Sequence, residues 1–280
     1  MEQEVYERSI DPATLTMLQK AKEEGAETAW ERYEKQLPQC SFGQLGICCR
    51  NCNMGPCRID PFGEEADRGI CGATADIIVA RNLLRSIAAG AAAHSDHARD
   101  TVLTFKKMSE GKAESYRIKD TAKLLSLASE YGISSEGGSL EEVAARLADI
   151  LLLEFGKQEG PILCTRRAPE IRLKLWAELG IEPRGIDREI VECMHRTHMG
   201  VDNNAVHILL QGLRTGLSDG WGGSMIATDI QDILFGTPQP RRSTVNLGVL
   251  SRDKVNVIVH GHEPILSEMI VEAAEDPELL

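Results

Sequence analysis

Six of the eight cysteines lie within one short segment of the chain, between residues 40 and 71. Their spacing is Cys-x7-Cys-Cys-x2-Cys-x4-Cys-x13-Cys, at Cys40, Cys48, Cys49, Cys52, Cys57 and Cys71. Residues 1–10 are charged and unlike a secretory leader, so we expect the reducing cytoplasm, where clustered cysteines bind metal more often than they form disulfides. Four thiolates hold one cubane iron–sulfur cluster, so six thiols supply all the ligands of one cluster and leave two thiols over. The segment therefore predicts a metal centre.

The six thiols divide into a set of four and a set of two. The set of four is Cys49, Cys52, Cys57 and Cys71. Its x2 and x4 steps lie in glycine-rich backbone, and Gly55-Pro56 supplies the sharp turn that lets the thiolates converge on one cluster. Side chains of adjacent residues diverge, so Cys48 is expected to face a different site, together with Cys40. Two ligands leave a cubane half coordinated, and a two-fold symmetric dimer would supply the other two.

Spacing alone does not separate an iron–sulfur cluster from a structural zinc site that uses four of the six thiols. A disulfide scaffold is the remaining interpretation, and the expected compartment argues against it. The two other cysteines have no such pattern. Cys164 follows a short apolar run and is predicted to be a buried core residue. Cys193 and His195 are two residues apart on a predicted helix and point to different faces, which favours structural roles.

Two pairs of histidines could take part in chemistry. His94 and His97 are three residues apart on a predicted alanine-rich helix, so both project from one face. They are either exposed or locally satisfied histidines, or a proton relay, for which imidazoles are suited because they titrate near neutral pH. His260 and His262 follow a predicted strand and precede a predicted helix, where open α/β sheets place their ligand sites.

Helical patterns account for most of residues 1–236. An amphipathic helix is predicted from Asp11-Pro12 to Pro38, and a long helix over residues 74–108 contains a run of small residues that lets a neighbour approach closely. Only the glycine- and proline-rich metal segment, about residues 40–71, lacks this periodicity, and it is predicted to be a loop-rich iron–sulfur module within the helical domain.

The end signals of further helices are also present. Shorter helices are predicted over residues 121–131, 143–155 and 169–179, and the last is expected to stop at Gly180. Asp120 is the expected cap of the first, and Ser139 with Glu142 forms a capping box ahead of the second. Three more helices are expected to open at Asp187, Asp202 and Ser224.

The character of the sequence changes near Pro238. Residues 255–260 form a β-branched run, followed by Gly261 and a helical pattern over residues 264–274. We predict a mainly α-helical domain over residues 1–236 and, over residues 237–280, the start of an α/β (Rossmann-like) domain that is present only as its first strand and helix. The chain is therefore expected to be an N-terminal fragment of a longer protein.

Charge and hydropathy exclude some classes of function. The 280 residues include 31 basic and 43 acidic side chains, for a net charge of −12, which argues against a nucleic-acid binder. A hydrophobic content of 42% predicts a soluble globular protein with a real core. The longest nearly apolar stretch, residues 75–93, is interrupted by charged side chains, so no membrane span is expected.

Four segments together resemble the catalytic subunit of anaerobic nickel-dependent carbon monoxide dehydrogenases. They are the cysteine array of residues 40–71, Ala-Ala-Ala-His-Ser-Asp-His at 91–97, Thr-His-Met-Gly-Val-Asp at 197–202 and Val-His-Gly-His-Glu-Pro at 259–264. The resemblance implies that Cys49, Cys52, Cys57 and Cys71 bind an internal [4Fe-4S] cluster. It implies that Cys40 and Cys48 are one subunit's half of a second [4Fe-4S] cluster, shared across a homodimer. His262, which follows the glycine, rather than His260, would be the histidine ligand of a [Ni-4Fe-4S] active-site cluster.

By this resemblance the reaction is the oxidation of carbon monoxide with water to carbon dioxide, two protons and two electrons. Electrons would leave through the internal and shared clusters to a ferredoxin-like acceptor, and His94 and His97 would carry protons. The sequence leaves open whether acetyl-CoA synthase is a partner. Two departures stand out: the sequence ends before the remaining cysteine ligands of the active-site cluster, and the next histidine positions of the relay hold Asp100 and Leu103.

Three alternatives keep the same metal segment. A hybrid-cluster protein also places a cysteine array before helical and α/β domains, although Cys40 and Cys48 speak against it. A non-catalytic electron-transfer module would bind the two [4Fe-4S] clusters without carbon monoxide chemistry. A zinc-stabilised helical interaction protein is the third, and it would be colourless.

Overall fold

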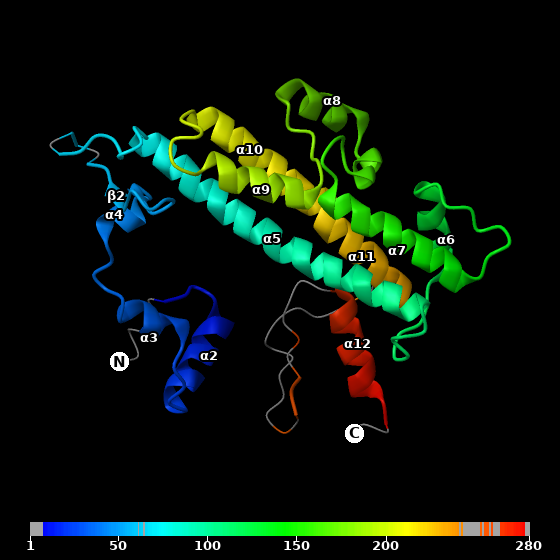
Figure 1. Ribbon diagram of the computed structural model, residues 1–280. Coiled ribbons are helices and arrows are strands. Elements are labelled where there is room, and N and C mark those ends of the chain that lie inside the picture. The colour runs from blue at the N-terminus through cyan, green and yellow to red at the C-terminus, as the bar shows by residue number, and fades with distance from the viewer. Residues whose placement is uncertain are drawn as a thin grey trace. The chain divides into compact units, whose positions relative to one another are not determined.

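Figure 1 shows the computed structural model, which describes residues 8–60, 62–63, 65–240, 242, 253, 255–257, 259 and 264–277. The chain divides into two compact units. One is Ser41–Pro238, and the other combines Met1–Cys40 with Gln239–Leu280. The described part is mainly helical, with one small antiparallel sheet. The limits predicted for the helical and α/β domains stay predictions.

The larger unit is organised along one long helix, α5 (Ala75–Ser109), which at 35 residues is about 52 Å long. Four helices pack against it, namely α7 (Leu140–Gly156), α9 (Ile186–Arg196), α10 (Ala205–Ser218) and α11 (Met225–Phe235). The small residues of α5 do admit a close neighbour, because a Cβ on Gly223 would lie 3.5 Å from the His94 backbone. This confirms the expected close approach along α5.

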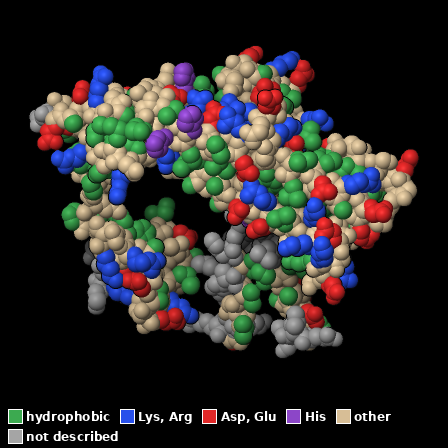
Figure 2. Space-filling model, in the orientation of Figure 1, with side chains coloured by type: hydrophobic (Ala, Val, Ile, Leu, Met, Phe, Trp, Pro, Cys, Tyr) green, Lys and Arg blue, Asp and Glu red, His purple; other side chains and the backbone are tan. Residues whose placement is uncertain are grey.

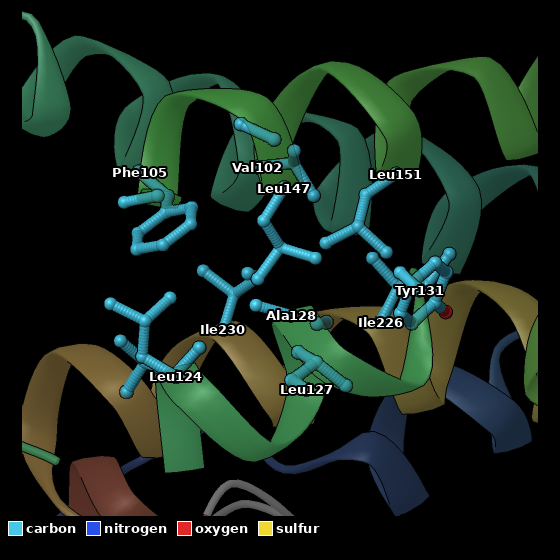
Figure 3. Packing of buried hydrophobic residues seen from close by; sticks show 14 of the residues in the cluster. Val102, Phe105, Leu124, Leu127, Ala128, Tyr131, Leu147, Leu151, Ile226 and Ile230 are labelled. Carbon is cyan, nitrogen blue, oxygen red and sulfur yellow. The ribbon is translucent and has the colours of Figure 1, made fainter. Parts of the chain in front are cut away.

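The main core lies where α5, α6 (Thr121–Glu130), α7 and α11 meet. Figure 3 shows apolar side chains from these four helices pointing toward one another. Those that it labels are Val102, Phe105, Leu124, Leu127, Ala128, Tyr131, Leu147, Leu151, Ile226 and Ile230. Each helix contributes residues three or four apart, which is the spacing of one helical face. Around this core Figure 2 shows basic and acidic side chains interspersed, and Lys106 and Asp149 form one such ion pair.

The predicted helix ends of this region are largely confirmed. The Asp120 carboxylate accepts from Lys123 N at the start of α6. Ser139 and Glu142 form both hydrogen bonds of the capping box at the start of α7. The helix α8 (Glu170–Leu179) ends at Gly180, whose φ of +65° lies in the left-handed region that glycine favours. A short 3-10 helix, Leu163–Arg167, precedes α8.

Two predicted helix starts are wrong by a few residues. The helix α9 begins after Gly185, where a Cβ would lie 2.8 Å from Lys157 N, so no capping side chain fits. Asp187 lies instead in the first turn and pairs with Arg99. The helix α10 is capped by Asn204, which accepts from two backbone N–H groups, and Asp202 lies in the preceding loop.

The predicted helix start at Ser224 is also wrong, because the chain is helical there without a break. A π-helix, Asp219–Ser224, joins α10 to α11, and Ser224 has helical angles (φ −64°, ψ −44°). Glycines make this wide turn fit: a Cβ on Gly222 would lie 2.8 Å from Ile186 Cγ1. The run Asp-Gly-Trp-Gly-Gly therefore belongs to a helix and not to a loop.

Between Cys40 and α5 the chain has little regular structure. It contains the single turn α4 (Ser41–Gln44) and the two-residue strands β1 (Cys48–Cys49) and β2 (Cys57–Arg58). This agrees with the predicted loop-rich segment.

The smaller unit contains α2 (Pro12–Glu23), α3 (Ala29–Glu34) and α12 (Pro264–Glu275). The single helix predicted from Asp11 to Pro38 is therefore wrong: Gly25, with a φ of +69°, ends α2, and a Thr28/Glu31 capping box starts α3. The helix predicted over residues 264–274 is present as α12. Residues 255–257 and 259 form no strand, and the rest of the predicted strand lies outside the described residues. None of the helices in the described part of the chain is both long and apolar enough to cross a membrane.

Candidate metal centre

A short hairpin decides which way the first cysteines face. Strands β1 and β2 are antiparallel, and Cys49 pairs with Cys57 while Cys48 pairs with Arg58. Cross-strand partners lie on the same face of a sheet, and successive residues lie on opposite faces. Cys49 and Cys57 therefore share one face, and Cys48 is on the other. The structure thus separates Cys48 from Cys49, as expected from their adjacency.

All four thiols of the predicted internal set line one cavity. Cys49, Cys52 and Cys57 come from the hairpin and its turn, and Cys71 comes from the loop just before α5. The end of α9 and the loop after it contribute Thr197 and Met199. Residues far apart in the sequence therefore enclose the space that the spacing predicts. Among the described residues, no three Cys, His, Asp or Glu side chains are grouped as ligands of a single metal ion.

One glycine is required where the backbone closes around these thiols, and two more lie beside them. A Cβ on Gly55 would lie 2.9 Å from Cys57 N and 3.0 Å from Cys49 O, so only glycine fits inside the hairpin turn. Cβ atoms on Gly69 and Gly200 would lie 3.6 Å from Cys57 Sγ and from Cys71 Cβ, respectively. The cavity is thus bounded by backbone that approaches the thiols closely.

Arg81 is the charged side chain of this cavity, and it is 1% exposed. Its Nη1 donates to Cys71 Sγ at 3.5 Å. Burial alone would raise the pKa of the Cys71 thiol, but hydrogen bonds from Arg81 and from the Ala73 and Gly200 backbone outweigh burial and lower that pKa. The thiolate, which is the form that binds metal, is therefore favoured.

Two buried donors at the cavity have no partner. They are Nε of Arg81 and Nδ2 of Asn51. Buried polar atoms in native proteins are nearly always hydrogen bonded, so each unpaired donor implies an acceptor that occupies the site in the functional protein. Four thiols with N–H donors beside them fit a sulfur-rich, negatively charged cluster.

The remaining predicted ligands lie elsewhere. Cys48 is half-buried outside the cavity lining, with its carbonyl accepting from Asn82 Nδ2. Cys40 is exposed and belongs to the smaller unit. His260 and His262 lie outside the described residues. Their roles as ligands stay predictions.

The predicted relay histidines are both exposed on α5. Nδ1 of His94 lies 3.0 Å from both carboxylate oxygens of Asp219, the first residue of the π-helix. Asp219 was not predicted as a partner of His94, because no local pattern in the sequence shows that it lies beside α5. The signal that could have indicated it is the glycine run that follows, because this run forms a π-helix and π-helical turns occur often at functional sites.

The two cysteines outside the array are buried, as expected. Cys164 Sγ lies 2.9 Å from the Tyr131 hydroxyl, and Cys193 Sγ lies 3.0 Å from Thr215 Oγ1. Burial raises the pKa of both thiols. His195 is exposed, so it faces away from Cys193 as predicted; Figure 2 shows histidine side chains gathered on the face of α9 and α10.

Comparison with known proteins agrees with this arrangement. Residues 47–280 match the Prismane/CO dehydrogenase family. The chain is 84% identical over its full length to carbon monoxide dehydrogenase 1 of Methanosarcina acetivorans, of which it covers 45%. It is similar to the Ni-free crystal structure of carbon monoxide dehydrogenase from Thermococcus sp. AM4 (TM-score 0.86, 56% identity, 98% of this chain and 44% of that one).

A second solved structure is that of acetyl-CoA synthase/carbon monoxide dehydrogenase with NiZn[Fe4S4] and NiNi[Fe4S4] clusters in its alpha subunits. It matches with a TM-score of 0.83 and 44% identity, over 95% of this chain and 40% of that one. The chain spans under half the length of curated relatives that it matches, at 45% for each of two Methanosarcina proteins.

Proposed function

The chain belongs to the Prismane/CO dehydrogenase family, and from this premise we propose that it is the cluster-binding N-terminal part of an anaerobic carbon monoxide dehydrogenase. The reaction is the oxidation of carbon monoxide with water to carbon dioxide, two protons and two electrons. The observation that carries the proposal is the cavity lined by four thiols and a buried arginine.

The internal [4Fe-4S] cluster is held by Cys49, Cys52, Cys57 and Cys71. When bound, it supplies one-electron transfer. Arg81 and the backbone beside Cys71 favour the thiolate that the cluster needs, and Thr197 and Met199 complete the lining of the cavity. These residues keep the site compact and partly shielded from water.

Cys40 and Cys48 supply half of a second [4Fe-4S] cluster, which a homodimer completes. Support comes from β1, which directs Cys48 away from the internal set and so leaves its thiol available for a different site. With both clusters bound, these six cysteines would hold the redox groups for electron transfer to a ferredoxin-like acceptor. An acetyl-CoA synthase subunit is a further candidate partner.

His262 is the ligand that this chain gives to the [Ni-4Fe-4S] cluster, at the start of an α/β domain over residues 237–280. The chain covers 45% of carbon monoxide dehydrogenase 1 of Methanosarcina acetivorans. By the family resemblance, the remaining ligands of the nickel cluster are expected in the length of the relatives that this chain does not span.

His94 and His97 carry protons away along one face of α5. The Asp219 carboxylate accepts from Nδ1–H of His94, which orients the ring and makes Nε2 the nitrogen that exchanges protons. His97 lies one turn farther along the same face.

The test is anaerobic reconstitution of the chain with iron and sulfide, followed by iron analysis and measurement of mass in solution. About twelve irons per dimer support two internal clusters and one shared cluster. About four irons in a monomer leave the internal site intact and refute the bridging role of Cys40 and Cys48. Zinc without iron overturns the assignment. Reduction of a dye with carbon monoxide by the nickel-loaded chain would overturn the alternative of a non-catalytic electron-transfer module.

A further inference from the structure

Arg81 is a buried cation that faces the cysteine cavity without a carboxylate partner. Nη1 donates to Cys71 Sγ, and Nη2 donates to the Asp202 carbonyl oxygen at 2.6 Å and to Asn203 Oδ1 at 2.8 Å. The Asp202 carboxylate pairs instead with Arg196, at 2.9 Å. Within the described part of the chain, Arg81 therefore donates hydrogen bonds to two neutral oxygen atoms and to the Cys71 thiol, which ionises when it binds metal.

A buried arginine of this kind needs a counter-charge. Its guanidinium stays protonated at any physiological pH, and burying such a charge unpaired is strongly unfavourable. The Nε atom of Arg81 has no hydrogen-bond partner. Asn51 Nδ2 is a second buried donor without a partner in the lining of the cavity. The compensating negative charge therefore comes from the four thiolates and the iron–sulfur cluster that they hold.

We propose that Arg81 is the positioning residue that raises the reduction potential of the internal cluster, by placing a fixed positive charge and N–H donors beside Cys71. This rests on the proposed function in so far as it needs a cluster on the four thiols. The oxidised cluster gains one electron from the reductant and becomes more negative. A positive charge beside it stabilises the reduced form more than the oxidised form, so the potential is higher with Arg81 than without it.

The surrounding loop holds this cation in place. Asp202 and Asn203 follow α9 and accept both hydrogen bonds of Nη2, so the guanidinium is anchored on the side away from Cys71. Arg85, one turn farther along α5, offers a matched control. Its Nε donates to Thr197 Oγ1 at 2.9 Å, and it does not line the cavity.

The experiment is a redox titration of the reconstituted 280-residue chain, in which dithionite reduces the cluster and electron paramagnetic resonance measures the reduced fraction. The variants are Arg81→Gln, Arg81→Lys and the control Arg85→Gln, each matched to wild type by iron content. At a given solution potential, Arg81→Gln should raise the ratio of oxidised to reduced cluster by about tenfold or more, which is a shift of about 59 mV for one electron. Arg81→Lys, which keeps the charge, should change this ratio by less than tenfold. Arg85→Gln should leave it unchanged.

The outcomes separate the two proposals. A wild-type chain that takes up no iron overturns the internal cluster itself. A loaded wild type with an unshifted Arg81→Gln, or an equal shift in Arg85→Gln, overturns only the role of Arg81. If Arg81→Gln takes up no iron, the result for Arg81→Lys decides whether the charge of Arg81 has the proposed role. Uptake of iron with a wild-type ratio then supports the role of the charge, and failure of the lysine variant as well, with unchanged circular dichroism, overturns it.

Discussion

Gly55 is the position at which the smallest substitution should disrupt the metal centre. A Cβ there would lie 2.9 Å from Cys57 N and 3.0 Å from Cys49 O, and both are backbone atoms of the hairpin. Backbone atoms do not rotate away as the end of a side chain does. Gly55→Ala must therefore shift one strand relative to the other, and this displaces two of the four thiols.

The size of the effect follows from the contacts. Forcing an extra methyl group into packed structure costs about 1–3 kcal/mol. Because the displaced groups are the ligands themselves, we expect the cost to appear in cluster binding. At about 1.4 kcal/mol per factor of ten, binding should weaken by about 5-fold to about 140-fold.

Gly69 supplies the matched control. It lines the same cavity, and its Cβ would lie 3.5 Å from Cys57 Cβ, which is an ordinary contact. Each reconstituted variant is titrated with an iron chelator while the visible absorbance of the cluster is followed. Gly69→Ala should resist the chelator like wild type, and Gly55→Ala should lose its cluster at much lower concentrations. Equal resistance of Gly55→Ala and wild type, or an equal loss in both variants, would refute the steric argument.

Three further predictions concern stability and reactivity. Gly222→Ala should lower the free energy of unfolding by about 1–3 kcal/mol, because its Cβ meets buried isoleucines. Gly220→Ala, whose added Cβ would have nothing within 4 Å, should leave the free energy of unfolding unchanged or raise it by up to about 1 kcal/mol. Equal denaturation midpoints for these two variants would contradict the prediction. Burial raises the pKa of the Glu192 carboxyl, but hydrogen bonds from arginines outweigh burial and lower it from 4.5 to about 2. The folded-state pKa is therefore the lower one, so this stabilisation is complete above pH 4.5 and is lost as the pH falls toward 2. Glu192→Gln should flatten this acid slope in thermal melts, and an unchanged slope would show that Glu192 does not cause it. Burial raises the pKa of the Cys164 thiol to about 11, against a hydrogen bond from Tyr131 that lowers it. Iodoacetamide at about pH 8 should therefore label exposed Cys40 in the folded apo chain and Cys164 only after denaturation, and equal labelling rates by mass spectrometry would count against the buried position.

Short-range signals in the sequence predicted much of the helical framework. The caps at Asp120 and Ser139 and the end at Gly180 are where the sequence places them. These features depend on hydrogen bonds between residues a few positions apart, so the local sequence contains the information. The separation of Cys48 from Cys49 is of the same kind, because adjacent side chains on a strand must diverge.

Helix starts and breaks were predicted less well where packing decides them. Gly185 replaces a polar cap because the Lys157 backbone leaves no room for a side chain. Ser224 looks like a cap, yet the π-helix continues through it because Gly222 fits against Ile186. A propensity for capping is worth about 1 kcal/mol, and tertiary contacts of this closeness override it.

The sequence by itself determined the kind of chemistry, since six thiols at short spacing are a metal segment in whatever fold presents them. Only the tertiary structure decided which other side chains act on that segment. Arg81 bonds to Asp202, 121 residues away, and His94 pairs with Asp219, 125 residues away. No periodicity or cap connects positions so far apart. The packing of α9, α10 and the π-helix against α5 brings them together, and that packing depends on the whole core rather than on any one segment.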